Sequence, residues 1–152
     1  MKLGRVIHIG IVVEDVEQSA AIYENKLGIG PWEISVPAEF FAMMTVNGGH
    51  DGLNIKTAMF KGEGYEIELI QPIGPGIYED WLRDKGPGLH HLKFETDDTY
   101  ADVVRESEEI SGRKPYLDVQ WPDGRPLVTY TDILKETGLL IEVSPSDDAP
   151  EE

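Results

Sequence analysis

An internal repeat constrains the fold of this chain more than any other feature of its sequence. GYEIEL at residues 64–69 matches GLLIEV at residues 138–143. Upstream of these, HIGIVVEDVEQSAAIYENKLG, which begins at His8, matches HLKFETDDTYADVVRESEEIS, which begins at His91. Aligned on the histidines, the apolar and acidic positions of the two segments coincide. The chain is therefore predicted to contain two copies of one unit, each running from a histidine-bearing strand to a glutamate-bearing strand.

Each copy is expected to form a strand, a helix and three further strands. Residues 6–13 are rich in β-branched side chains and are followed by the acids Glu14 and Asp15, which favours a strand. Asp15 and Asp98 are the expected N-caps of the two helices, because an aspartate side chain can accept hydrogen bonds from free N–H groups of the first turn. GIYEDWLRDKGPG predicts a connecting helix that ends before Gly86-Pro87-Gly88. The remaining strands are expected at 32–36, 53–60, 65–70, 114–121, 126–133 and 139–143.

The predicted fold class is therefore α+β, with two βαβββ modules in a single domain. The 152 residues are enough for two small modules that share a core. The expected boundaries are 1–75 for the first module, 76–87 for the connecting helix, 88–145 for the second module and 146–152 for a disordered acidic tail.

Glu142 is unusual in its surroundings, because Leu139, Ile141 and Val143 belong to the same apolar strand. An ionised carboxylate is costly there unless a positive or hydrogen-bonding group compensates it. Side chains alternate along a strand, so Glu142 points away from those three residues. If the apolar sets face the helices, the repeated histidines and glutamates converge on the opposite, concave side of the sheet: His8, Glu68, His91 and Glu142.

Two imidazoles and two carboxylates are a common ligand set for a divalent first-row metal, and their charges neutralise the ion. A six-coordinate ion with these four ligands keeps two positions for water or substrate. We therefore expect a divalent ion as cofactor, with Co, Mn, Ni, Mg and Zn all compatible with this set.

The sequence resembles the vicinal oxygen chelate superfamily and, within it, the glyoxalase and methylmalonyl-CoA epimerase branch. The segments that carry the resemblance are HIGIVVEDVEQSAAIYENKLGIGPWE, ELIQP, GLHHLKFETDD and GLLIEVSP, and together they span residues 5–145. The resemblance implies a glyoxalase/bleomycin-resistance-type fold, with the two modules forming a cup around the metal and a homodimer as the assembly. It also implies that the ligands are the four residues named above and that His91, rather than the adjacent His90, binds the metal.

The activity that this resemblance implies is that of a metal-dependent epimerase or racemase. Such an enzyme removes and returns a proton at a carbon next to a carbonyl, through a metal-stabilised enolate. The expected substrate is an acyl-CoA thioester or an aryl ketone such as a dihydroflavonoid-like compound. The alternatives are a glyoxalase-I-type lactoylglutathione lyase and a non-catalytic small-molecule-binding protein.

One departure from the epimerase pattern concerns the catalytic base. Asn54 stands where the epimerases carry a catalytic glutamate, and an amide cannot act as a base at neutral pH, although it can hydrogen-bond an enolate. The base is then expected to be Glu68 or Glu142, with Glu39 and His50 as further candidates.

The insertion PAEFFAMMTVNGGHDG offers candidate substrate contacts. Phe40, Phe41 and Met44, with Met43 beside them, can wall a pocket for an acyl or aromatic group. The alternative is an ordinary strand that plugs the open side of the sheet or forms a dimer contact. Lys56 is a candidate contact for an anionic substrate such as CoA. The other candidates for that role are Lys61, Lys93 and Arg125, and all four also fit scattered surface cations.

Composition excludes several classes of function. A formal net charge of −16 argues against nucleic acid as a partner and leaves a small molecule as the expected one. The chain has no cysteine, so disulfides and thiolate metal sites are excluded and a cytoplasmic location is expected. The apolar run from Val6 to Val13 is too short to span a membrane and is not followed by a signal-peptide cleavage site.

Overall fold

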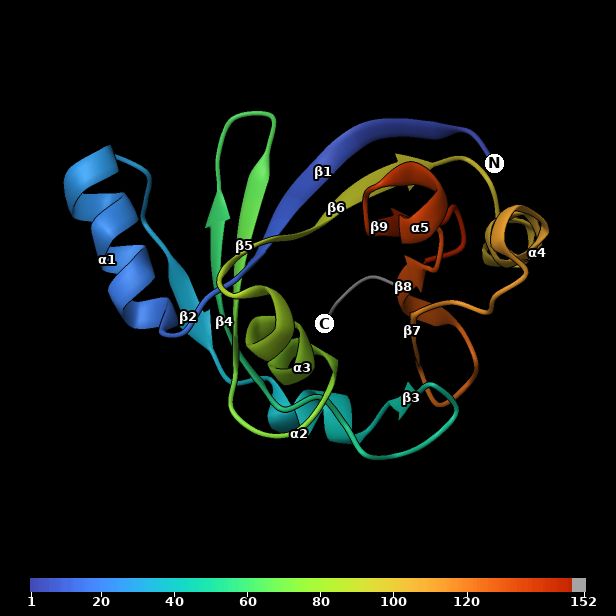
Figure 1. Cartoon of the computed structure of the whole chain (residues 1–152), viewed down its shortest axis with the longest axis horizontal. Coiled ribbons are helices and arrows are strands. Elements are labelled where there is room, and N and C mark those ends of the chain that lie inside the picture. Colours follow the sequence, from blue (N-terminus) through green and yellow to red (C-terminus); the bar gives the residue numbers. More distant parts are fainter. Residues whose placement is uncertain (149–152) are drawn as a thin grey trace. The chain divides into compact units, whose positions relative to one another are not determined.

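The computed structural model describes residues 1–148 and contains, within them, nine strands and five helices (Figure 1). In chain order they are β1 (Leu3–Val12), α1 (Val16–Leu27), β2 (Glu33–Ser35), α2 (Ala38–Ala42), β3 (Thr45–Val46), β4 (Ile55–Lys61), β5 (Glu66–Pro72), α3 (Ile77–Lys85), β6 (Gly88–Thr96), α4 (Tyr100–Ser111), β7 (Leu117–Gln120), β8 (Pro126–Thr131), α5 (Leu134–Thr137) and β9 (Ile141–Ser144). The predicted α+β class with a repeated βαβββ order is confirmed: α3 connects the two copies, while α2 and β3 form the insertion in the first. No helix among residues 1–148 is long and apolar enough to cross a membrane.

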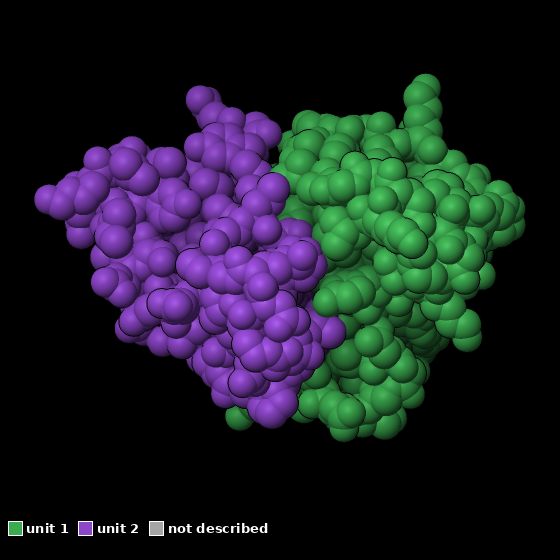
Figure 2. Space-filling view, viewed as in Figure 1, with its two compact units in different colours: residues 1–7, 39–52, 91–152 green, residues 8–38, 53–90 purple. Residues whose placement is uncertain are grey.

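The chain divides into two compact units whose boundaries differ from those of the two repeats (Figure 2). Unit 2 comprises residues 8–38 and 53–90, and unit 1 comprises residues 1–7, 39–52 and the chain from 91 onward. The insertion therefore belongs with the second repeat. Its strand β3 pairs with β7, and the backbone N–H of Asp118 donates to Asn47 Oδ1 at 2.8 Å.

In unit 2 the sheet is built from parallel β1–β5 pairing followed by antiparallel β5–β4 and β4–β2 pairing. Helix α1 packs on β4 and β5, over a core that contains Val16, Ala58 and Leu69. Asp15 caps α1 as predicted, accepting from the Gln18 N–H at 3.0 Å. Gly28 ends the helix with a φ of 69°, a left-handed conformation that glycine adopts without a Cβ penalty.

In unit 1 the order is parallel β6–β9 pairing, then antiparallel β9–β8, β8–β7 and β7–β3 pairing. Val103 of α4 packs against Ile133, Ile141 and Val143, so the apolar side of β9 faces the core as the alternation predicts.

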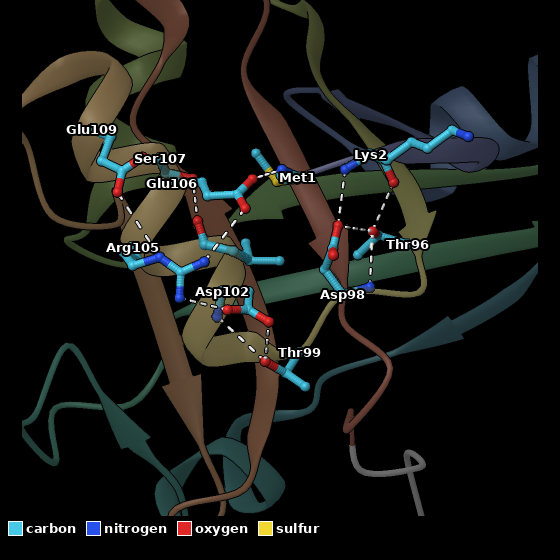
Figure 3. Close-up of polar contacts among 11 residues, drawn as sticks. Met1, Lys2, Thr96, Asp98, Thr99, Asp102, Arg105, Glu106, Ser107 and Glu109 are labelled. Carbon is cyan, nitrogen blue, oxygen red and sulfur yellow. Dashed lines mark hydrogen bonds and ion pairs between the residues drawn. The ribbon is translucent and has the colours of Figure 1, made fainter.

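The N-cap of α4 is Thr99, and the prediction of Asp98 was wrong. The Thr99 side chain accepts from the Asp102 N–H, which satisfies one of the free donors of the first turn. The Asp98 carboxylate instead accepts from the Lys2 N–H at 2.9 Å and lies 3.0 Å from the Thr96 hydroxyl (Figure 3). Aspartate and threonine side chains can both accept hydrogen bonds at a helix N-terminus. Thr99 is the cap here because the Asp98 carboxylate already accepts a hydrogen bond from the N-terminal segment.

Asp98→Asn is expected to lower the melting temperature at neutral pH. The difference in melting temperature between the two proteins should become smaller as the pH falls below 3.8, the ordinary pKa of an aspartate. The hydrogen bond from the Lys2 N–H, with the Thr96 hydroxyl, lowers the pKa of Asp98. A carboxyl group whose folded pKa is lowered stabilises the fold above its unfolded pKa, and this contribution disappears as the pH falls through the folded value. Thermal melts of both proteins across this range measure the effect, with the exposed neighbour Asp97→Asn as control. A destabilisation that is independent of pH would contradict the electrostatic origin.

The segment after β9 differs from the expected disordered tail over its described part. The Ser146 N–H donates to the Asp98 carbonyl oxygen at 2.8 Å, the Tyr100 N–H donates to Asp147 Oδ1 at 2.7 Å, and the Ser144 hydroxyl donates to Asp148 Oδ2 at 2.9 Å. These bonds hold residues 146–148 against unit 1, and residues 149–152 of the expected tail lie outside the described part of the chain.

Candidate metal centre

Unit 2 places one histidine and one glutamate on the same face of its sheet. The parallel register pairs Gly10 of β1 with Glu68 of β5, so His8, two residues before Gly10, lies on the same side as Glu68. His8 Nε2 lies 3.8 Å from Glu68 Oε1. Leu69 points to the helix-covered side, so the alternation that buries it also orients Glu68 away from that core.

Unit 1 repeats this arrangement with a shorter contact. His91 Nε2 lies 3.0 Å from Glu142 Oε2, and the two side chains are 0% and 5% exposed. The register pairs Lys93 with Glu142 across β6 and β9, and Tyr130 with Glu142 across β8 and β9. The His91 and Tyr130 ring centroids are 4.7 Å apart. Glu142 is thus a buried carboxylate enclosed by an imidazole, a tyrosine and a lysine.

The donor atoms of these pairs fit a divalent ion. Two ligand atoms at about 2.1 Å from one ion and at right angles to each other lie about 3.0 Å apart. The His91–Glu142 separation of 3.0 Å has this value, and the His8–Glu68 separation of 3.8 Å is somewhat wider. Imidazole nitrogen and carboxylate oxygen are the donors that first-row divalent metals accept. Each unit therefore contains one histidine–glutamate pair whose donor atoms are of the types that a divalent metal accepts.

Lys56 lies on the other face of the sheet from Glu68, so its predicted contact with a substrate on the glutamate side is not what the structure shows. In β4 it shares a side with Ala58 and Phe60, which belong to the core under α1. Its ammonium pairs with Glu17 of α1 at 2.6 Å. The sequence alone could have predicted this orientation of Lys56. Side chains two residues apart in a strand share a face, and Lys56 lies two residues before Ala58 and four before Phe60.

Asn54 holds a loop. Its Nδ2 donates to the carbonyl oxygen of Pro75 at 2.8 Å, and its own carbonyl oxygen accepts from the Ile73 N–H at 2.9 Å. In this arrangement the side-chain amide is engaged by the turn that precedes α3. Glu39 and His50, the other candidates from the insertion, are both exposed.

The insertion begins as a helix, so the interpretation of Phe40 and Phe41 as part of an ordinary strand was wrong. Phe40 makes edge-on ring contacts with Phe41 at 5.4 Å and with Trp121 at 5.6 Å. Met44 is fully buried and is a core residue of unit 1, whereas Met43 is exposed. Trp121 follows β7, and nothing in its sequence context singled it out as the partner of Phe40.

The remaining candidate residues, one histidine and three cations, differ in burial and in their partners. His90 is buried against the rings of Tyr78 and Trp81, at 5.2 and 4.5 Å, and the role of His91 as the ligand stays a prediction. Arg125 is exposed and pairs with Asp123 at 2.8 Å, and Lys61 is exposed at the end of β4. Lys93 alone of the four cations lies beside a candidate ligand, with Nζ 3.7 Å from Glu142 Oε1.

A family model for the Glyoxalase/Bleomycin resistance protein/Dioxygenase superfamily matches residues 7–111. The chain belongs to this superfamily. The match runs from the start of the first repeat through α4 of the second, and it confirms the resemblance drawn from the motifs.

Curated relatives of this superfamily member include named epimerases. The chain is 30% identical to the mitochondrial methylmalonyl-CoA epimerase of Homo sapiens over 105 residues, which are 67% of this chain and 52% of that protein. It is 29% identical to the ethylmalonyl-CoA/methylmalonyl-CoA epimerase of Cereibacter sphaeroides over 101 residues, which are 65% of this chain and 66% of that protein. The chain thus spans between about half and two thirds of the length of these relatives.

Solved structures show the same fold over nearly the whole chain. A Streptomyces coelicolor methylmalonyl-CoA epimerase variant in complex with 2-nitronate-propionyl-CoA has a TM-score of 0.68 at 22% identity, covering 95% of this chain and 99% of that one. A Mycobacterium tuberculosis methylmalonyl-CoA epimerase has a TM-score of 0.64 at 19% identity, covering 97% and 90%.

Proposed function

We propose that this protein is a metal-dependent epimerase that removes and returns the proton at the carbon next to the thioester carbonyl of an acyl-CoA. The observation that carries the proposal is the recurrence of a histidine–glutamate pair at equivalent positions of both repeats, buried in unit 1 and partly buried in unit 2. The similarity to proteins named as methylmalonyl-CoA epimerases supplies the substrate class and favours it over an aryl ketone. The homodimer and the cytoplasmic location stay predictions.

His8, Glu68, His91 and Glu142 would hold one divalent ion in this proposal. Such an ion, when bound, attracts substrate oxygens and makes an adjacent C–H bond more acidic. The protein's own contribution is to present two carboxylates, Glu68 and Glu142, that exchange a proton with the substrate carbon. One of them, ionised, takes the proton from one face of the carbon, and the other, already protonated, gives its own proton to the opposite face, which inverts the stereocentre.

Asn54 takes no part in the proton transfer proposed here, because its amide is engaged by Pro75. The exposure of the Glu68 side chain, 22%, exceeds the 5% of Glu142, so Glu68 is the carboxylate more open to solvent. This difference suits two groups with separate roles in taking and returning the proton.

Loss of the α-proton signal in D2O tests the proposal. The protein is loaded with manganese or cobalt, freed of excess ion and incubated with methylmalonyl-CoA, and the reaction is followed by NMR after removal of the paramagnetic protein. We expect exchange well above that of the metal-free protein. Bound metal without exchange of this substrate, but with turnover of a hemithioacetal, would support the glyoxalase-type alternative. Absence of metal binding would favour a non-catalytic binding protein.

A further inference from the structure

Lys93 occupies a distinctive place in unit 1. It lies two residues after His91 on the same side of β6, and it is the cross-strand neighbour of Glu142 in β9. Its side chain is 14% exposed, and its ammonium lies 3.7 Å from Glu142 Oε1. A cation this enclosed, beside a candidate metal ligand, calls for a role other than that of a surface lysine.

The two oxygens of Glu142 face different partners. Oε2 lies 3.0 Å from His91 Nε2, whereas Oε1 lies 3.7 Å from Lys93 Nζ. A carboxylate can give a metal one oxygen or both, and the choice depends on what holds the second oxygen. Here the second oxygen faces a fixed positive charge.

Lys93 also has a second acidic group in its surroundings, that of Asp148. Asp148, in the segment after β9, accepts from the Ser144 hydroxyl at 2.9 Å. Asp148 also lies within electrostatic reach of Lys93. The ammonium thus has two acidic groups in its surroundings, Glu142 at 3.7 Å and Asp148 within electrostatic reach. This arrangement compensates its charge and offsets the repulsion that an isolated lysine would exert on a nearby divalent ion.

We propose that Lys93 is a positioning residue that restricts Glu142 to one metal-binding oxygen, Oε2, and keeps Oε1 off the ion for proton transfer. This inference rests on the proposed metal site. It assigns to Lys93 neither a metal bond nor a substrate contact, since it acts through Glu142.

The test compares Lys93→Met with Lys93→Arg and with Lys26→Met. Methionine keeps the length of the stem and removes the charge, arginine restores the charge, and Lys26 is an exposed lysine that controls for the change in net charge. The first readout is the water-proton relaxation rate of the manganese-loaded protein, which reports the water molecules on the ion. The second is the manganese affinity, and the third is α-proton exchange in D2O.

In Lys93→Met both oxygens of Glu142 are expected to bind the ion and displace one of two waters. The relaxation enhancement should fall by about twofold and the manganese affinity should rise. The kcat for exchange should fall by about tenfold or more, because the proton-accepting oxygen is then occupied. Lys93→Arg should recover most of the loss, and Lys26→Met should behave as the unchanged protein.

Two results would overturn the inference, and they are distinguishable. If the unchanged protein binds no ion, the metal site fails and the role of Lys93 fails with it. If the unchanged protein binds manganese and Lys93→Met leaves relaxation, affinity and kcat unaltered, the metal site stands and only the positioning role is wrong. Circular dichroism and thermal melts of the metal-free variants verify that each one folds.

Discussion

Glu142→Gln is expected to lower the affinity of the protein for manganese or cobalt by about 100-fold or more and to reduce α-proton exchange to the metal-free level. Loss of a residue that only orients a metal ligand already costs 10- to 100-fold in affinity, so loss of a charged ligand costs at least as much. Glutamine preserves the size of the buried side chain but presents a neutral amide next to His91. It also removes one of the two carboxylates to which we assign proton transfer.

Isothermal titration with the metal-free protein measures the first effect, and NMR in D2O measures the second. Glu95→Gln is the matched control, because Glu95 lies on the same side of β6 as His91 but is exposed and pairs with Arg5 at 3.6 Å. The control should retain metal binding and exchange. Unchanged metal affinity in Glu142→Gln would remove this residue from the ligand set, whatever the exchange rate does.

Leu69→Ala is expected to lower the free energy of unfolding by about 2–5 kcal/mol, the range for a buried leucine. Leu69 is fully buried in β5, on the side that packs under α1 with Val16 and Ala58. The substitution leaves a cavity in the core between α1 and the sheet. The lost free energy of unfolding therefore includes both the transfer free energy of the removed atoms and the cost of the unfilled cavity.

Urea denaturation of the metal-free protein measures this loss. Ile73→Ala serves as control, because Ile73 follows β5 and is 49% exposed, so its truncation should cost well under 1 kcal/mol, roughly a surface effect. The register of β5 also leads us to expect that Leu69→Ala weakens metal binding only slightly in the folded protein. Equal losses for the two variants would contradict the assignment of the covered and open faces of β5.

Local features of the sequence determined the repeat, the order of the elements and the faces of the ligand strands. Two segments of matched pattern predicted two βαβββ modules, and the period of two along a strand separated Glu142 from Ile141 and Val143. This separation of apolar and polar side chains onto opposite faces follows from the backbone geometry of a strand alone. For the same reason His8 and Glu68 were predicted to share a face, and the parallel register of β1 and β5 places them on one.

Tertiary structure decided everything that depends on which segments meet. Asp98 and Thr99 are both good helix caps, and the N-terminal strand determined the outcome by engaging Asp98. The insertion joined unit 1 because β3 pairs with β7, more than 70 residues later in the chain. Lys93 was one of four equivalent cations in the sequence, and only the register of β6 against β9 brought it to Glu142. Propensity and periodicity act over a few neighbouring residues, whereas these contacts are fixed by strand pairing between segments far apart in the chain.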